Sequence, residues 1–185
     1  MLYDSYMGSF VNRFDKSIMH VITTWPKWLV LVMQLLSFVG YPVFTVGLTV
    51  IIGVLGIIRD NTGLVLAAIV GISVIIINCI LKLVTHRARP AGHDSKHLFC
   101  FDIYSFPSGH TSGSTVTYGL LAYLLWCTLT SPFDIIVVII TAVVVIGIGI
   151  SRVYIGAHYP TDVLAGWILG LLGLLTITNV IGSLL

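Results

Sequence analysis

Three short polar clusters carry the side chains in this sequence that could do chemistry. They are KLVTHRARP with Lys82 and Arg89, PSGH with Ser108, Gly109 and His110, and SRVYIGAHYPTD with Arg152, His158 and Asp162. Any one of the three cations alone could simply reach lipid headgroups. Together they repel one another unless an anion joins them. Asp162 is the one carboxylate clearly near them, so the pattern predicts a bound anion, and phosphate fits best.

The PSGH cluster has the composition of a helix start. Pro107 suits the first turn, where its missing N–H costs nothing. The N–H groups that follow have no intrahelical partner and lie at the positive end of the helix dipole. Ser108 adds a hydroxyl, and Gly109 lets an anion approach the backbone. His110 can carry a proton near neutral pH. Pro-Ser-Gly alone is a common helix start, and it is the histidine facing three cations that favours an anion site.

His158 and Asp162 lie four positions apart at another predicted helix start, so their side chains can meet. A carboxylate bonded to one ring nitrogen fixes the tautomer and leaves the other nitrogen as a nucleophile. A lone His–Asp pair is more often a structural hydrogen bond. The pair is therefore interpreted as catalytic because of the cations and the second histidine around it.

The composition indicates an integral membrane protein. Of 185 residues, 57% are apolar and 9% are charged, more apolar surface than a water-soluble domain of this size can bury. The net charge of +2 is too small to indicate a nucleic-acid partner. Three cysteines without CxxC spacing predict neither a zinc site nor a disulfide framework.

The apolar segments predict an all-α polytopic membrane bundle of about five or six spanning helices. The five clear spans are about 42–58, 63–84, 108–129, 133–150 and 162–183, and the sixth is the short segment 28–39, either a half-span or an extension of the first helix. Counting crossings places the polar connectors 86–106 and 151–161 on one side of the membrane. We therefore expect all three clusters to share one end of the bundle.

The first 27 residues form a segment of different character, and the domain proper is expected at 28–185. Apolar side chains recur every three or four positions, at Met7, Phe10, Val11, Phe14, Ile18, Val21, Ile22 and Trp25. This pattern predicts an amphipathic helix that ends near Pro26. Its apolar face could lie in the membrane interface or pack on the bundle, and the sequence leaves both open.

The three clusters together resemble the three-part signature of the type 2 phosphatidic acid phosphatase (PAP2) superfamily, and in particular its small bacterial membrane lipid phosphatases. The matching positions are Lys82-x6-Arg89-Pro90, Pro107-Ser108-Gly109-His110 and Ser151-Arg152-x5-His158-x3-Asp162. The resemblance implies a helical-bundle core and a phosphatase that needs no metal and no cofactor.

The resemblance also implies a role for each matched residue. His158 would attack phosphorus and form a phosphohistidine, Asp162 would orient His158, and His110 would protonate the leaving oxygen and then activate water. The phosphate oxygens would be bound by Lys82, Arg89, Arg152, Ser108 and the Gly109 N–H. Positioning and electrostatic stabilisation are the means by which phosphoryl transfer is catalysed.

The expected partners are bilayer lipids and a lipid phosphate substrate: phosphatidate, phosphatidylglycerophosphate or a polyprenyl diphosphate. No nucleic-acid partner is expected, and the oligomeric state stays open. Two alternatives remain: a lipid phosphotransferase with the same histidine chemistry, and a non-catalytic protein that binds anionic lipid. The charge bias, with Arg59 on one side and Arg13, Lys16 and Lys27 on the other, favours a cytoplasmic site. The resemblance favours an external one, which we adopt.

Three further features are interpreted in their simplest sense. The aromatic residues that could line a lipid entry are interpreted as interfacial anchors: Phe99, Phe101, Tyr104 and Trp167. The basic residues that follow the first cluster's helix are interpreted as a solvated loop, with Asp94 and Asp102 in the same segment: His86, Arg87, His93, Lys96 and His97. The GWILG stretch at 166–170 is expected to pack within the bundle in preference to a dimer seam.

Overall fold

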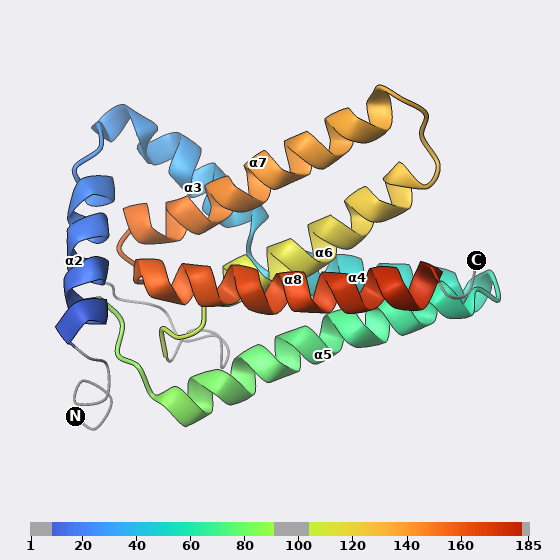
Figure 1. The fold of residues 1–185 in the computed structure, drawn as a ribbon, viewed down its shortest axis with the longest axis horizontal. Coiled ribbons are helices and arrows are strands. Elements are labelled where there is room, and N and C mark those ends of the chain that lie inside the picture. Colours follow the sequence, from blue (N-terminus) through green and yellow to red (C-terminus); the bar gives the residue numbers. More distant parts are fainter. Residues whose placement is uncertain (1–8, 91–103, 183–185) are drawn as a thin grey trace.

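The computed structural model describes residues 9–90 and 104–182, and these residues form a helical bundle (Figure 1). The elements are α2 (Ser9–Thr23), the short 3-10 helix η1 (Lys27–Leu29), α3 (Val30–Val39), α4 (Pro42–Ile58), α5 (Thr62–Thr85), α6 (Gly109–Trp126), α7 (Phe133–Tyr154) and α8 (Pro160–Gly182). The all-α class is confirmed. The five predicted spans match α4 to α8 to within a few residues.

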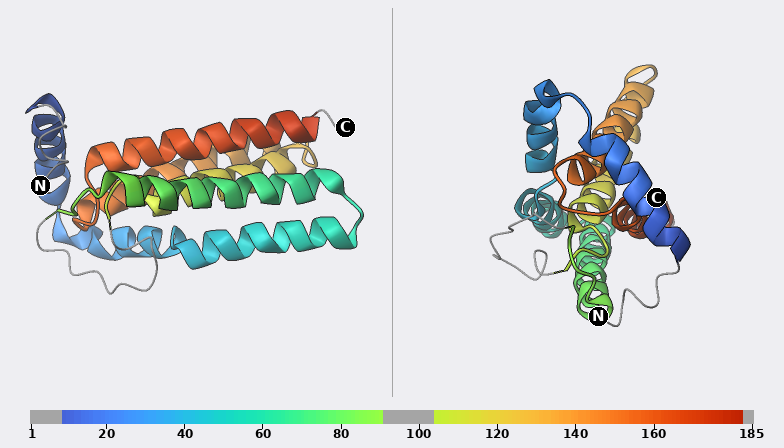
Figure 2. Two further views of the ribbon diagram at one scale, coloured as in Figure 1. Left: turned by 90° about the horizontal axis from the view of Figure 1, so that it is seen from below. Right: turned by 90° about the vertical axis from the view of Figure 1, so that its left-hand side faces the viewer.

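Four helical stretches are long and apolar enough to cross a membrane: Lys27–Ile58, Thr62–Thr85, Phe133–Tyr154 and Pro160–Asn179. The first joins η1, α3 and α4, and α3 meets α4 at an angle (Figures 1 and 2). The short segment 28–39 therefore extends the first predicted span. The chain breaks between α3 and α4 at Gly40, where a Cβ atom would lie 2.5 Å from the side chain of Ile148 on α7. Glycine thus lets the broken helix press against α7.

Helix α6 is not among the four apolar stretches, although we expected a span over 108–129. It contacts α4, α5, α7 and α8, and most of its side chains are buried. Because protein surrounds it, α6 needs little apolar surface of its own and can use small and hydroxyl residues. The hydroxyls find internal partners: Thr115 donates to the Thr111 carbonyl at 2.7 Å, and Thr117 lies 2.9 Å from the Thr49 hydroxyl of α4.

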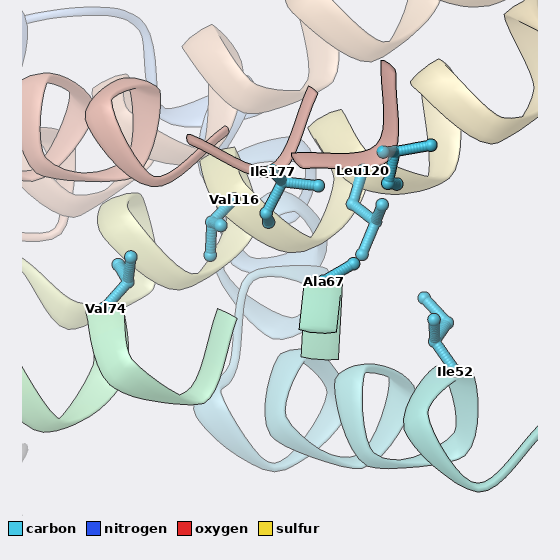
Figure 3. Close-up of a cluster of buried hydrophobic side chains, with 7 residues drawn as sticks. Ile52, Ala67, Val74, Val116, Leu120 and Ile177 are labelled. Carbon is cyan, nitrogen blue, oxygen red and sulfur yellow. The ribbon is translucent and has the colours of Figure 1, made fainter. Parts of the chain in front are cut away.

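A buried apolar cluster joins α4, α5, α6 and α8 (Figure 3). Its members are Ile52, Ala67, Val74, Val116, Leu120, Ile177 and Ile181. Beyond this cluster α5 ends, α6 begins, α7 ends and α8 begins at the same end of the bundle (Figure 1). The expectation that the three polar clusters share one end is confirmed.

Helix α2 is the predicted amphipathic helix, and it lies across that end of the bundle (Figure 2). Its apolar side chains are largely exposed, with Phe10 74% and Val21 57% accessible. The same helix contacts α7 and α8 and buries Asp15, which is 1% exposed. Helix α2 therefore packs on the bundle, but through a polar face, and its apolar face stays exposed, so its place in the membrane interface remains a prediction. Met7 lies outside the described residues.

The GWILG glycines pack inside the bundle, as expected. A Cβ atom on Gly166 would lie 2.8 Å from the Ser108 carbonyl oxygen, and one on Gly170 would lie 2.5 Å from Thr115 Cβ. Both neighbours belong to the start of α6 and the residue before it. The stretch thus brings α8 close to the PSGH cluster.

Substitution of Gly170 by alanine tests this packing. We expect Gly170→Ala to lower the free energy of unfolding by about 1–3 kcal/mol, the usual cost of overpacking. Gly47→Ala is the control, because nothing lies within 4 Å of the position its Cβ would take. Thermal unfolding in detergent measures both variants. Equal stability of the two would contradict the close α6–α8 contact.

Candidate active site

The first cluster contributes two cations whose positions are fixed by backbone carbonyls. Lys82 is completely buried at the end of α5, and its Nζ donates to the Tyr104 carbonyl at 2.8 Å. Arg89 donates from Nη1 to the Ala157 carbonyl at 3.2 Å. Since Ala157 directly precedes His158, this bond joins the first and third clusters. Their predicted convergence is observed.

The third cation comes from α7 and is held by α3. Arg152 is 7% exposed, and its Nη1 donates to the hydroxyl of Ser37. The sequence reasoning did not single out Ser37, since a lone serine in an apolar segment carries no signal of a distant partner. The broken first span therefore reaches the site through its α3 part.

The PSGH cluster forms the start of α6 as predicted, except that Pro107 precedes the N-cap residue Ser108 and so lies before the first turn. The first helical bond runs from the Ser112 amide to the Ser108 carbonyl at 3.0 Å. The amides of the three residues between them, 109–111, thus have no intrahelical acceptor. Ser108 is buried, its amide donates to the Asp162 carbonyl at 3.0 Å, and its Oγ accepts from the Thr111 hydroxyl at 2.9 Å. Its own hydroxyl hydrogen remains to be donated to a ligand.

His110 stands at this helix start, 6% exposed, with its ring edge-on to Tyr41 at a centroid distance of 5.6 Å. It interacts electrostatically with the other members of the predicted set: Arg152, His158, Arg89 and Lys82. Residues from three separate segments therefore lie close enough to His110 to act on its charge.

His158 and Asp162 lie side by side but are not hydrogen-bonded, which corrects the predicted bond. His158 Nδ1 is 3.6 Å from Asp162 Oδ2, and this nitrogen has no hydrogen-bond partner among the described residues. The reason is competition: Asp162 Oδ2 accepts the Tyr159 amide at 2.8 Å, and Oδ1 accepts from Arg87. These two donors hold the carboxylate beside the imidazole without a direct hydrogen bond between them.

The surroundings of His158 favour its neutral form. Burial lowers the pKa of its imidazole well below the ordinary value, and the charges of Lys82, Arg152 and Arg89 lower it further. A neutral imidazole retains a lone pair on one ring nitrogen, which is the form a nucleophile requires.

Arg87 is a functional residue that the sequence reasoning missed, since it was interpreted as part of a solvated loop. It is 5% exposed and forms ion pairs with Asp162 and with Asp15 of α2. Burial alone would lower the pKa of its guanidinium, but Asp162 and Asp15 raise it above the ordinary value. Its guanidinium also lies 4.3 Å from the centre of the Tyr159 ring. The one signal for Arg87 in the sequence was its position two residues before Arg89 of the first cluster.

The remaining sequence candidates divide into two groups. Trp167 donates to the Val145 carbonyl at 3.3 Å and so joins α8 to α7, whereas His86 is exposed and packs edge-on against the Tyr104 ring at 4.6 Å. The others lie outside the described residues: His93, Asp94, Lys96, His97, Phe99, Phe101 and Asp102. Within 9–90 and 104–182, no three His, Cys or Asp side chains gather as metal ligands would.

Comparison with known proteins identifies a family and several relatives of this chain. The family model described as the PAP2 superfamily matches residues 62–184. Phosphatidylglycerophosphatase B of Bacillus subtilis is 38% identical over 149 residues, which are 78% of this chain and 71% of that protein. Undecaprenyl-diphosphatase of Sulfolobus acidocaldarius is 48% identical over 68 residues, 36% of this chain and 29% of that protein.

Two solved structures share the fold. The crystal structure of the transmembrane PAP2-type phosphatidylglycerolphosphate phosphatase from Bacillus subtilis has a TM-score of 0.82 at 31% identity, covering 98% of this chain and 91% of that one. Aquifex aeolicus LpxE has a TM-score of 0.61 at 20% identity, covering 88% and 93%, and supports the fold alone.

The state of His158 can be measured directly. We expect its imidazole to titrate below the ordinary pKa of 6.5 in histidine-selective NMR of the folded protein. The unfolded chain takes up this proton near 6.5, so the free energy of unfolding falls as the pH drops below that value. Titration of His158 at or above 6.5 would contradict the burial and the cationic surroundings described here.

Proposed function

The chain belongs to the PAP2 superfamily, and from that premise we propose that it is an integral-membrane lipid phosphatase with His158 as its nucleophile. The family model covers 62–184, two thirds of the chain. The proposed phosphatase domain is 28–185, preceded by the segment 1–27. The observation that carries the proposal is the meeting of Lys82, Arg89 and Arg152 beside two histidines.

In the proposed reaction, the neutral His158 attacks phosphorus with Nε2, since Nδ1 faces Asp162. A P–N bond forms as the P–O bond to the lipid breaks, and His110 gives its proton to the leaving oxygen. His110 then takes a proton from water, which attacks the phosphohistidine and releases inorganic phosphate. Asp162 stabilises the positive charge that His158 gains in the first step.

In the bound substrate, the oxygens of the phosphate accept hydrogen bonds from several donors of the site. The proposed phosphate-binding groups are the side chains of Lys82, Arg89, Arg152 and Ser108 and the amide of Gly109. Three cations held by neighbouring oxygens offset the charge of a phosphate dianion, and they require no rearrangement when charge builds up on its oxygens.

A lipid is the proposed substrate class because the site lies at one end of spanning helices. A lipid can present its phosphate there while its tails stay in the bilayer. The relatives' names indicate two headgroups, phosphatidylglycerophosphate and undecaprenyl diphosphate. Phosphatidate is the third candidate. The three differ in what the phosphate is attached to, and a panel in detergent micelles ranks them by kcat/KM.

The purified protein is expected to release inorganic phosphate from at least one of these lipids. The reaction should persist in EDTA and stop with vanadate, which mimics five-coordinate phosphorus. His158→Ala and His110→Ala should each reduce kcat by about 10³-fold or more, because each removes a group that forms or breaks a bond.

His20→Ala is the matched control, since His20 is an exposed histidine of α2 that has no part in the proposed reaction. It should retain the wild-type rate. Phosphate release that needs added magnesium, or that survives in His158→Ala, would contradict the proposed mechanism.

The proposed location of the site is the external face of the cell membrane. The family resemblance supports this orientation, while the cations Arg13, Lys16 and Lys27 near α2 favour the reverse. The C-terminal end of α8 lies at the opposite end of the bundle from the polar clusters (Figure 1). The two orientations therefore place the C-terminus on different sides.

A fusion at the C-terminus separates these orientations. A fluorescent protein that matures only in the cytoplasm should fluoresce when joined after Leu185, because an external site puts this end inside. An alkaline phosphatase fusion at the same position should stay inactive. Active alkaline phosphatase with a dark fluorescent fusion would place the site in the cytoplasm.

A further inference from the structure

Helix α2 carries a buried carboxylate that the reaction outlined above does not use. Asp15 is 1% exposed, although the neighbouring Phe14 and Lys16 are exposed. A buried charge is costly unless it is paired and hydrogen-bonded. The hydrogen-bond partners of Asp15 within residues 9–90 and 104–182 belong to the catalytic end of the bundle. They are the Thr161 amide at 2.9 Å, the Thr161 hydroxyl at 2.7 Å and Arg87.

These contacts place Asp15 at the first turn of α8, the helix that carries Asp162. Accepting the Thr161 amide, Asp15 acts as a cap supplied by another helix, since that amide lies in the first turn and has no intrahelical acceptor. A carboxylate at this end also interacts favourably with the dipole of α8. The position of α8 at the site thus depends on a residue of α2.

The second link runs through the Arg87 guanidinium, whose two ends are shared between two carboxylates. Nη1 donates to Asp162 Oδ1 and to the Thr161 hydroxyl at 2.8 Å, while Nη2 donates to Asp15 Oδ2. A planar guanidinium held at both ends has one orientation. The hydrogen bond from Arg87 to Asp162 fixes the position of this carboxylate, whose Oδ2 lies 3.6 Å from His158 Nδ1.

Charge balance gives Asp15 a second effect. Arg87 and Asp162 alone would form a neutral pair, leaving no net charge to stabilise His158 when it becomes positive. Asp15 makes the set of three net negative. His158 otherwise faces cations from several elements: Lys82 of α5, Arg89 after α5 and Arg152 of α7, with the titratable His110 of α6 beside them.

We infer that Asp15 is a positioning residue of the catalytic centre, acting on His158 through Arg87 and Asp162, so that α2 forms part of the catalytic unit. The inference rests on the proposed role of His158. The family match begins at residue 62, so α2 lies outside it. The exposed apolar side chains of α2, Phe10 and Val21 among them, fit a helix that rests on the bilayer while its polar face holds the site.

The test compares Asp15→Asn with Asp60→Asn, an exposed aspartate at the far end of the bundle. Both variants remove one carboxylate charge and keep the side-chain size. With phosphatidate, phosphatidylglycerophosphate and undecaprenyl diphosphate in micelles as probes, Asp15→Asn should reduce kcat about tenfold or more and change KM less than about twofold. Asp60→Asn should match the wild type in both.

The pH profile separates positioning from mere anchoring. Loss of the Asp15 charge disfavours protonated His158, so the acidic limb of kcat/KM should move to lower pH in Asp15→Asn. Loosening of the fold would lower the amplitude and leave the limb in place. A kcat within twofold of wild type, or a rate loss equal to the loss of folded protein, would overturn the inference.

A second variant and an independent readout keep the test decisive if Asp15→Asn does not fold. Thr161→Val removes the hydroxyl that bridges Asp15 and Arg87, and it should lower kcat in the same direction by a smaller factor. Histidine-selective NMR of this variant and of Asp15→Asn reports His158 without any substrate. If the wild-type protein releases no phosphate, the proposed function is wrong. Separately, if the pKa of His158 is the same in both variants as in the wild type, the role of Asp15 is wrong.

Discussion

The gathering of three buried or half-buried cations at one end of the bundle is the constraint on which this structure depends. Lys82 and Arg89 come from one stretch of chain and Arg152 from another, and the mutual repulsion of the three cations opposes every contact that brings them together. Carbonyl oxygens and the Ser37 hydroxyl hold their heads in place. In the proposed function a tetrahedral oxyanion offsets this repulsion, so that the energy spent in folding this arrangement becomes available for binding phosphate.

A second set of charged residues, with the opposite net sign, also lies close to His158. Asp15, Arg87 and Asp162 form a chain of ion pairs that begins on α2 and ends beside the imidazole. In the proposed reaction the cations favour a neutral histidine at the start, and the carboxylates favour the positive histidine that forms during the attack. A nucleophile between two such sets can gain charge without movement of either, which is the preorganisation that phosphoryl transfer requires.

Much of this arrangement follows from the sequence because it is local. Apolar length sets the helices, Pro107 and Pro160 mark two helix starts, and crossing counts place the clusters at one end. The pairing of Asp15 with Arg87 spans 72 positions and has no local signature. The same holds for Ser37 with Arg152. The distance between His158 and Asp162 depends on which donors bond to the carboxylate of Asp162. Tertiary packing determines these donors.

The most direct test of the central claim is the site of covalent phosphate during turnover. Protein quenched with base while it hydrolyses labelled phosphatidate, phosphatidylglycerophosphate or undecaprenyl diphosphate should carry an acid-labile label on the peptide that contains His158. The account predicts that label in the wild type, and its absence when His158 is replaced by alanine, because the residue that forms the P–N bond is then missing. Rapid turnover with the label on another residue, or with no labelled protein at any time point, would contradict it.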